Sequence, residues 1–125
     1  MTINEAITLA DKMKPNMMER AVKVRFLNEI EGKIHREILM KHAHATEEET
    51  EPHYDNNTDQ GTEMLVPAPY DSIYLFWIMA QIDLLNQEMD KYNNDRALFE
   101  DAWNNFSDFW TREHMPIQAR PNFLL

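Results

Sequence analysis

The sequence predicts an all-α fold, a small bundle of about four helices in a single helical domain over residues 1–125. Long segments carry apolar residues at a period near 3.6, glycine occurs only twice, and no segment shows the alternation of a half-buried strand. With 43% hydrophobic and 27% charged residues, a chain of 125 residues is typical of one globular domain with a modest core.

The first two helices are separated by Pro15. Thr2 and Glu5 have the spacing of a capping box, in which each side chain satisfies a free amide at a helix start. Pro15 ends this helix because the residue before proline avoids the α region. A second helix is expected from about Met17 to Lys41. Each carries an apolar stripe: Ile3, Ala6, Ile7, Ala10 and Met13 in the first, and Phe26, Leu27, Ile30, Ile34 and Ile38 in the second.

An acidic, proline-containing loop over residues 43–68 is expected next. Between Ala43 and Leu65 the chain has no Lys or Arg and seven acidic residues, which are Glu47, Glu48, Glu49, Glu51, Asp55, Asp59 and Glu63. This segment holds −7 of the net charge of −10. Clustered like charges without apolar periodicity predict a mobile, solvated loop from Ala43 to Glu63 that is dispensable for folding.

The third helix is the most apolar element. It is expected to begin at an Asp71 or Ser72 cap, and apolar residues cover nearly its whole circumference as far as Leu85. Such a helix is either central in a core or divided between the core and an interface. Beyond Leu85 it is expected to continue as a one-sided helix until Asn93-Asn94, since asparagine tolerates the left-handed conformation that ends helices.

The fourth helix is expected from an Asp95 cap to Pro116, with a C-terminal arm over 116–125. Its stripe consists of Ala97, Phe99, Ala102, Trp103, Phe106, Phe109 and Trp110. We expect the third and fourth helices to form an antiparallel hairpin with the second helix packed across them, because their apolar stripes are complementary.

Charge and composition exclude several functional classes. A chain with 12 basic and 22 acidic residues lacks the clustered cations that bind DNA phosphates by counterion release. The absence of cysteine excludes disulfides and thiolate metal sites. The amino terminus has no signal-peptide pattern. The uninterrupted apolar run from Ile73 to Ala80 is far shorter than the roughly 20 residues of a spanning helix, so we expect no membrane partner.

No catalytic, cofactor or metal site is expected. His42 and His44, with Glu47, Glu48, Glu49 and His53 nearby, are the best metal candidates, but a real site needs three or four converging ligands. Asp83 lies among apolar residues and needs a partner, for which His35, Arg36, Arg25 and Arg96 are the candidates. A structural ion pair is favoured over a general base, because no nucleophile, glycine-rich loop or oxyanion donor set accompanies it.

Three segments, read in order, resemble small proteins from the head-gene region of tailed phages and prophages, described as head–tail connector or adaptor proteins. They are RFLNEIEGKIHREI (25–38), LVPAPYDSIYLFWIMAQID (65–83) and YNNDRALFEDAWNNFSDFWTREHMP (92–116). The resemblance covers most of the chain, although none of these segments is a catalytic signature.

The resemblance implies an all-α structural subunit with no enzymatic activity. It implies a homo-oligomer, a dodecameric ring in the particle, although the isolated chain can still be a monomer. The ring would lie between the portal protein and the next tail-side connector protein, at the head–tail interface of the virion, after assembly in the host cytoplasm. Double-stranded DNA would pass through its centre without tight binding.

Two groups of residues are candidates for that role. The partner interface is expected to include Phe123, Leu124 and Leu125 of the arm, with Tyr74 and Trp77 of the third helix. The arm either folds back on its own core or docks on another subunit. The acidic residues from Glu47 to Glu63 are expected to face the channel or solvent. The rival interpretation is a non-virion acidic phage or prophage binding protein, a DNA mimic or an inhibitor of a host factor.

Overall fold

The computed structural model describes residues 1–41 and 51–114. The fold is all-α, as predicted, and consists of α1 (Ile3–Met13), α2 (Arg20–Glu37), the short 3-10 helix η1 (Leu39–Lys41), α3 (Ser72–Leu85) and α4 (Met89–Glu113). No strand occurs in the described residues, where an isolated bridge pairs Thr2 with Glu63. None of the helices in these two ranges is long and apolar enough to span a membrane.

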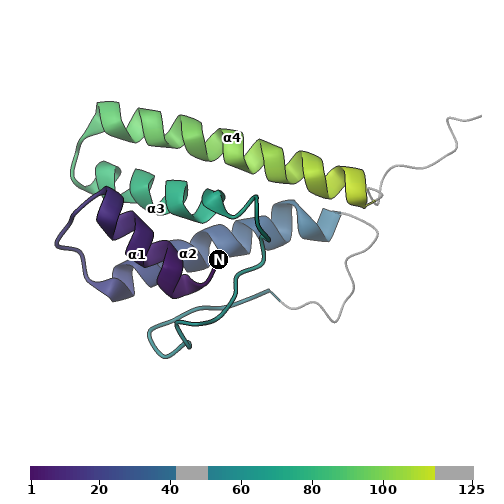
Figure 1. Ribbon diagram of the computed structural model, residues 1–125, viewed down its shortest axis with the longest axis horizontal. Coiled ribbons are helices and arrows are strands. Elements are labelled where there is room, and N and C mark those ends of the chain that lie inside the picture. Colours follow the sequence, from purple (N-terminus) through teal and green to yellow (C-terminus); the bar gives the residue numbers. More distant parts are fainter. Residues whose placement is uncertain (42–50, 115–125) are drawn as a thin grey trace, which may run out of the picture.

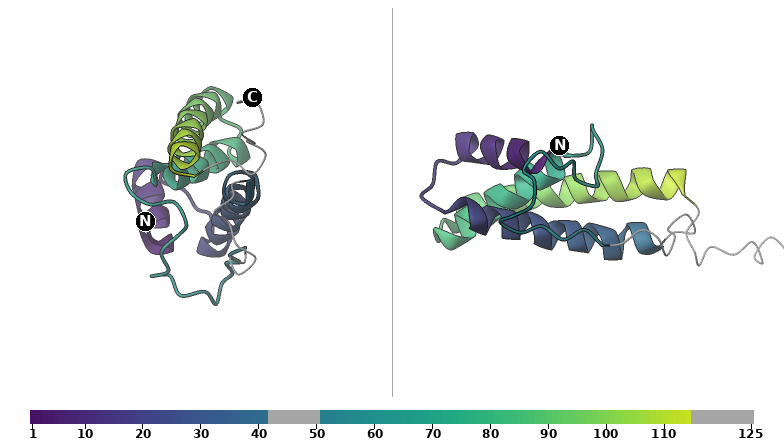
Figure 2. Two further views of the ribbon diagram at one scale, coloured as in Figure 1. Left: turned by 90° about the vertical axis from the view of Figure 1, so that its right-hand side faces the viewer. Right: turned by 90° about the horizontal axis from the view of Figure 1, so that it is seen from below.

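Helix α3 lies at the centre of the molecule. It packs against α1, α2 and α4 (Figures 1 and 2). The predicted antiparallel hairpin of α3 and α4 is confirmed, and α2 packs on α3. Contact on three sides explains why α3 is apolar around nearly its whole circumference, since each direction meets another helix.

The first helix begins as predicted. The Thr2 side chain accepts a hydrogen bond from the Glu5 amide at 3.1 Å, and the Glu5 carboxylate accepts one from the Thr2 amide at 3.2 Å. Ile3, Ala6, Ile7 and Ala10 are buried, whereas Met13 is exposed. Lys14 caps the helix, directly before Pro15.

The predicted boundary between the third and fourth helices is wrong. The break lies at residues 86–88, where Gln87 adopts a positive φ of 60°. Helix α4 then runs without interruption through Asn93 and Asn94, and Asp95 is buried inside it instead of capping it. The cost of asparagine inside a helix is only a few tenths of a kcal/mol, about 0.7 at most. The packing of Asp95 and Phe99 outweighs this cost and keeps the helix continuous through Asn93 and Asn94.

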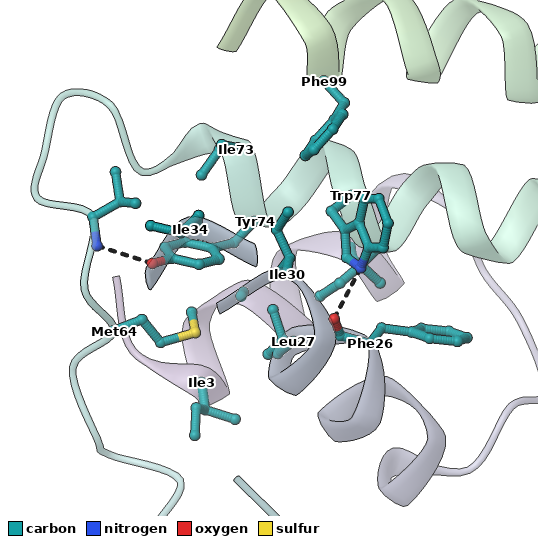
Figure 3. Packing of buried hydrophobic residues seen from close by; sticks show 14 of the residues in the cluster. Ile3, Phe26, Leu27, Ile30, Ile34, Met64, Ile73, Tyr74, Trp77 and Phe99 are labelled. Atoms are coloured by element: carbon teal, nitrogen blue, oxygen red, sulfur yellow. Dashed lines mark hydrogen bonds between the residues drawn. The ribbon is translucent and has the colours of Figure 1, made fainter. Parts of the chain in front are cut away.

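The core is built around two hydrogen-bonded aromatic residues of α3. The Trp77 indole donates to the Phe26 carbonyl at 2.8 Å, and the Tyr74 hydroxyl accepts from the Val66 amide at 2.9 Å (Figure 3). Ile30 and Ile34 of α2 surround them, as predicted from the stripe of that helix. Burying an aromatic ring with its polar atom satisfied avoids the penalty of an unpaired donor or acceptor.

The expectation of a mobile loop from Ala43 to Glu63 is wrong for residues 51–63. Tyr54 is buried, and its amide donates to the Asn28 side chain at 2.7 Å. The amides of Ile3 and Asn4 donate to the carbonyls of residues 62 and 60, at 3.2 and 2.9 Å. This part of the loop therefore packs against both α1 and α2. Residues 43–50 lie outside the described part of the chain.

Candidate functional site

A buried carboxylate joins α2, α3 and the loop. Glu31 is fully buried, and its Oε2 accepts hydrogen bonds from the Tyr54 hydroxyl at 2.7 Å and the Leu65 amide at 2.8 Å. Its Oε1 accepts from the Tyr74 hydroxyl at 2.5 Å. Three donors, two from the loop and one from α3, thus converge on one side chain. All three donors are uncharged, and the positive amino terminus of Met1 adds a smaller favourable charge interaction.

The pKa of each group reflects this arrangement. Burial raises the pKa of the Glu31 carboxyl above its usual range, and the hydrogen bonds from Tyr74, Leu65 and Tyr54 offset part of that effect. Burial, and then the negative charge of Glu31, raise the pKa of both tyrosine hydroxyls. The tyrosines therefore remain protonated donors at ordinary pH, which suits a structural role and not acid–base catalysis.

A second buried cluster joins α1 to the α3–α4 hairpin. Lys14 Nζ lies 2.8 Å from Asp83 Oδ2 and 3.2 Å from Asp95 Oδ2. Both aspartates are buried, with 2% and 5% of their surface exposed. The prediction that Asp83 needs an ionic partner is confirmed, but the partner is Lys14 and none of the four candidates named from the sequence.

The pKa values of Asp95 and Lys14 are shifted upward. Burial, and next the hydrogen bond with Asp83, raise the pKa of Asp95 to about 6, while Lys14 acts in the opposite direction. Burial lowers the pKa of Lys14, but its hydrogen bonds and charge interactions with the two aspartates outweigh that effect and raise it overall. This cluster carries one positive charge and two ionisable carboxyls.

Several exposed apolar residues lie at one end of the bundle, which we call the apolar end. Helix α1, the connection 14–19, the end of α3 and the start of α4 meet there (Figure 1). Met17, in that connection, is 100% exposed. Met13 lines a hollow together with Asn86, Glu88 and Lys91, so the α1 terminus lies beside the α3–α4 turn. The exposed apolar residues of this end are Met13, Met17, Leu84, Leu85 and Met89.

A second apolar feature is a groove between α2 and α4, which we call the aromatic groove. It has a volume of about 230 Å³ and is lined by Trp77, Phe99 and Trp103. The Trp77 and Phe99 ring centroids are 5.0 Å apart, and those of Phe99 and Trp103 are 6.0 Å apart. The charged residues along it are Lys33, Glu37, Arg96 and Glu100, and Lys33 Nζ lies 5.3 Å from the centre of the Trp77 ring.

Two residues assigned to the partner interface are placed in the core. Tyr74 is fully buried and Trp77 is 7% exposed. Their polar atoms bond within the chain, to Glu31 and to the Phe26 carbonyl, so neither polar atom is available to a partner, although Trp77 also lines the aromatic groove. The sequence could not separate a helix surrounded by its own chain from one shared with a neighbour. Phe123, Leu124 and Leu125 lie outside the described residues.

The described acidic residues of the loop are exposed. Glu51, Asp55, Asp59 and Glu63 are all at the surface, and the Glu51 carboxylate pairs with the Arg36 guanidinium at 2.6 Å. Glu47, Glu48 and Glu49 fall outside the described residues, as do His42 and His44. His53 is exposed, and no metal-binding group of three or more acidic or histidine residues occurs in the ranges 1–41 and 51–114.

Four features of these sites were not predicted from the sequence: the roles of Glu31 and Lys14, the burial of Asp95, and the apolar end. Glu31 did carry a signal, because it is four residues after Leu27 and three before Ile34, on the apolar face of α2. Asp95 stands four residues before Phe99, in line with the α4 stripe.

Comparison of the chain with protein-family models, with curated proteins and with solved structures finds no match.

Proposed function

We propose that this protein is a structural, non-catalytic subunit of a phage head–tail connector, which assembles as a ring between the portal and the tail-side proteins. The resemblance of residues 25–38, 65–83 and 92–116 to connector proteins motivates the proposal. The observation that carries it is the apolar end, where five large apolar side chains are exposed on elements that meet at one end of the bundle. Contiguous exposed apolar surface marks interaction sites more often than isolated apolar residues do.

The chain offers both halves of a head-to-tail contact. A ring is built from heterologous contacts, in which one surface of a subunit meets a different surface of the next. Three of the five residues of the apolar end are methionines, and methionine sulfur makes favourable contacts with aromatic rings. The aromatic groove, with two tryptophans and a phenylalanine, fits that chemistry.

The size and charge of the two surfaces support the same pairing. An apolar cavity of ~150 Å³ holds a benzene molecule, so a groove of about 230 Å³ has room for a methionine side chain. Glu19, close to Met17, is exposed, and Lys33 and Arg96 lie along the groove. An acidic residue beside the inserted methionine would therefore meet cations on the neighbouring subunit. Such pairing favours correct register more than affinity.

The charge of the chain supports passage of DNA without binding. The net charge is −10, and the described loop acids are at the surface. Like charge repels the phosphate backbone, so a channel that presents these residues would let the duplex slide.

The test measures self-assembly and the identity of the two contacting surfaces. The chain has no cysteine, so Met17→Cys and Glu100→Cys can be placed in separate preparations and mixed under oxidising conditions, alone and with portal protein. We expect a disulfide-linked dimer from the mixture and a ring by native mass spectrometry. Leu9→Cys, exposed on α1, replaces Met17→Cys in a matched control mixture that should not cross-link.

Function itself is tested by complementation. Met17→Glu should leave a folded chain and fail to restore tailed, DNA-filled particles to a phage lacking its own copy of this gene. Normal particles containing the variant would show that assembly does not require the apolar end. If phage without the gene assemble normally, or if the chain binds a host DNA-binding enzyme and never a portal, the connector proposal is wrong.

A further inference from the structure

The cluster of Lys14, Asp83 and Asp95 has one cation for two buried carboxyls. With both aspartates ionised, it carries a net charge of −1 in a place that water reaches poorly. A buried charge without a partner is costly, and a group in that position tends to change its protonation state instead. One proton bound to the pair makes the cluster neutral.

The proton is best placed on Asp95. Its pKa is raised to about 6, first by burial and then by the hydrogen bond with Asp83. The charged groups facing it are Lys14 from the end of α1 and Asp83 from α3. Glu88 and Lys91, paired at 2.8 Å, line the adjoining hollow with Lys14 and Asp83, where the α3–α4 turn leads into α4.

We propose that Asp95 is a proton switch that controls how firmly the end of α1 is held against the α3–α4 hairpin. When Asp95 is protonated, its hydroxyl donates to the Asp83 carboxylate, and Lys14 then faces a single negative charge. When the proton leaves to solvent, the second carboxylate has no cation of its own and the contact loosens. The switch does not depend on the connector proposal.

The switch acts where the apolar end is formed. Lys14 follows Met13 directly and begins the connection that carries Met17. Its amide donates to the Ala10 carbonyl at 2.8 Å and closes the last turn of α1. Loss of the proton therefore loosens the backbone that positions these two methionines, so a change of pH near 6 alters the surface that the molecule presents.

The test compares Asp95→Asn, which resembles the protonated side chain, with the unaltered protein across pH 4 to 7.5. A carboxyl with a pKa of about 6 in the folded chain and 3.8 in the unfolded chain stabilises the fold fully below pH 3.8, and this contribution is lost as pH rises through 6. The amide side chain of the variant cannot titrate. The unfolding constant of the unaltered protein, divided by that of the variant, should therefore rise by roughly 50-fold between pH 4 and 7, as measured by urea titrations.

A control variant and two site-specific measurements complete the test. Asp101→Asn removes the same charge from an exposed position of α4 and should follow the unaltered protein at every pH. The ¹³C shift of the Asp95 carboxyl should titrate near pH 6. The hydrogen-exchange rate of the Lys14 backbone amide, corrected for base catalysis, should increase above that pH in the unaltered protein. It should not increase in Asp95→Asn.

Asp83→Asn gives a second, independent measurement if Asp95→Asn folds poorly. It leaves one carboxyl for one ammonium, so the titration of Asp95 should move well below pH 6. A carboxyl titration of Asp95 near pH 4 in the unaltered protein, or an unchanged ratio of unfolding constants across the range, would falsify the switch.

Discussion

Glu31 and the Asp83–Asp95 pair are both buried acidic groups, but the molecule satisfies them in opposite ways. Glu31 receives three hydrogen bonds from uncharged donors, and the aspartates share one ammonium. In the first case the carboxylate is held by hydrogen bonds from uncharged donors. In the second case a cation is present, but one ammonium faces two carboxyls. The two clusters therefore separate what hydrogen bonds contribute to a buried acid from what an opposite charge contributes.

The largest effect is expected for Glu31→Ala. It leaves two tyrosine hydroxyls and the Leu65 amide without their acceptor, and each buried unsatisfied group costs about 1–3 kcal/mol. We expect a loss of about 3–6 kcal/mol in the free energy of unfolding, measured by urea titration at pH 7. Glu31→Gln keeps the shape of the side chain but turns an amide group toward the Leu65 donor. We expect its loss in the free energy of unfolding to be smaller than that of Glu31→Ala. A loss below about 1 kcal/mol for the alanine variant would mean that water replaces the carboxylate.

Lys14→Met is expected to have the next largest effect. Removing one partner of a buried pair costs roughly 3–5 kcal/mol, and the partial exposure of Lys14 places our expectation at about 2–4 kcal/mol at pH 7. The cost should be smaller at pH 5, because protonation of Asp95 removes part of the repulsion that the lysine no longer offsets. For Glu31→Ala the three unpaired donors persist at both pH values. A cost for Lys14→Met that is equal at pH 5 and 7 would contradict this account.

Two tyrosine variants separate the hydrogen bonds of Glu31. Tyr74→Phe removes a donor to Glu31 and the acceptor of the Val66 amide, whereas Tyr54→Phe removes one donor. At about 0.5–1.5 kcal/mol for each ordinary bond, and more for a bond to a charged group, we expect Tyr74→Phe to cost about twice as much. Thermal and urea unfolding of both variants measure this ratio. A larger loss from Tyr54→Phe would show that the single bond of Tyr54, and not the two bonds of Tyr74, dominates the cluster.

The smallest effect on stability is expected at the apolar end. Met17→Ser changes a fully exposed side chain, so the free energy of unfolding should stay within about 0.5 kcal/mol of the unaltered value. Self-association, measured by sedimentation at rising concentration, should nevertheless weaken. A variant of this kind affects self-association without affecting folding stability. Variants of the two buried clusters should instead lower folding stability.

The helices could be predicted from the sequence because their signals are local. The Thr2–Glu5 capping box, Pro15 and the apolar stripes each lie within a few residues of the structure they determine. The α3–α4 boundary could not be placed, because Asn93-Asn94 resembles a helix end while the packing of Asp95 on Lys14 keeps α4 continuous. Tertiary contact outweighed a weak local preference.

The buried clusters depend on contacts between residues far apart in the chain. Asp83 was expected to be paired, yet its partner comes from the cap of α1, 69 residues earlier. Tyr54 is one aromatic residue among many acids, and composition alone gave no reason to bury it. Tyr74 is fully buried although it was expected at an interface, because apolar periodicity indicates burial and does not identify what covers the side chain.

The arrangement of α1 has a consequence for the order in which the chain folds during synthesis. The Met1 carbonyl accepts from the Met64 amide, the Ile3 amide donates to the Thr62 carbonyl, and Lys14 pairs with Asp83 and Asp95. Helix α1 is synthesised before residues 62 and 64 of the loop and before Asp83 and Asp95, so its packing cannot be completed until these later partners have been synthesised. Apolar surface that is uncovered during this interval is prone to aggregation, and a chaperone that shields the apolar stripe of α1 would prevent it.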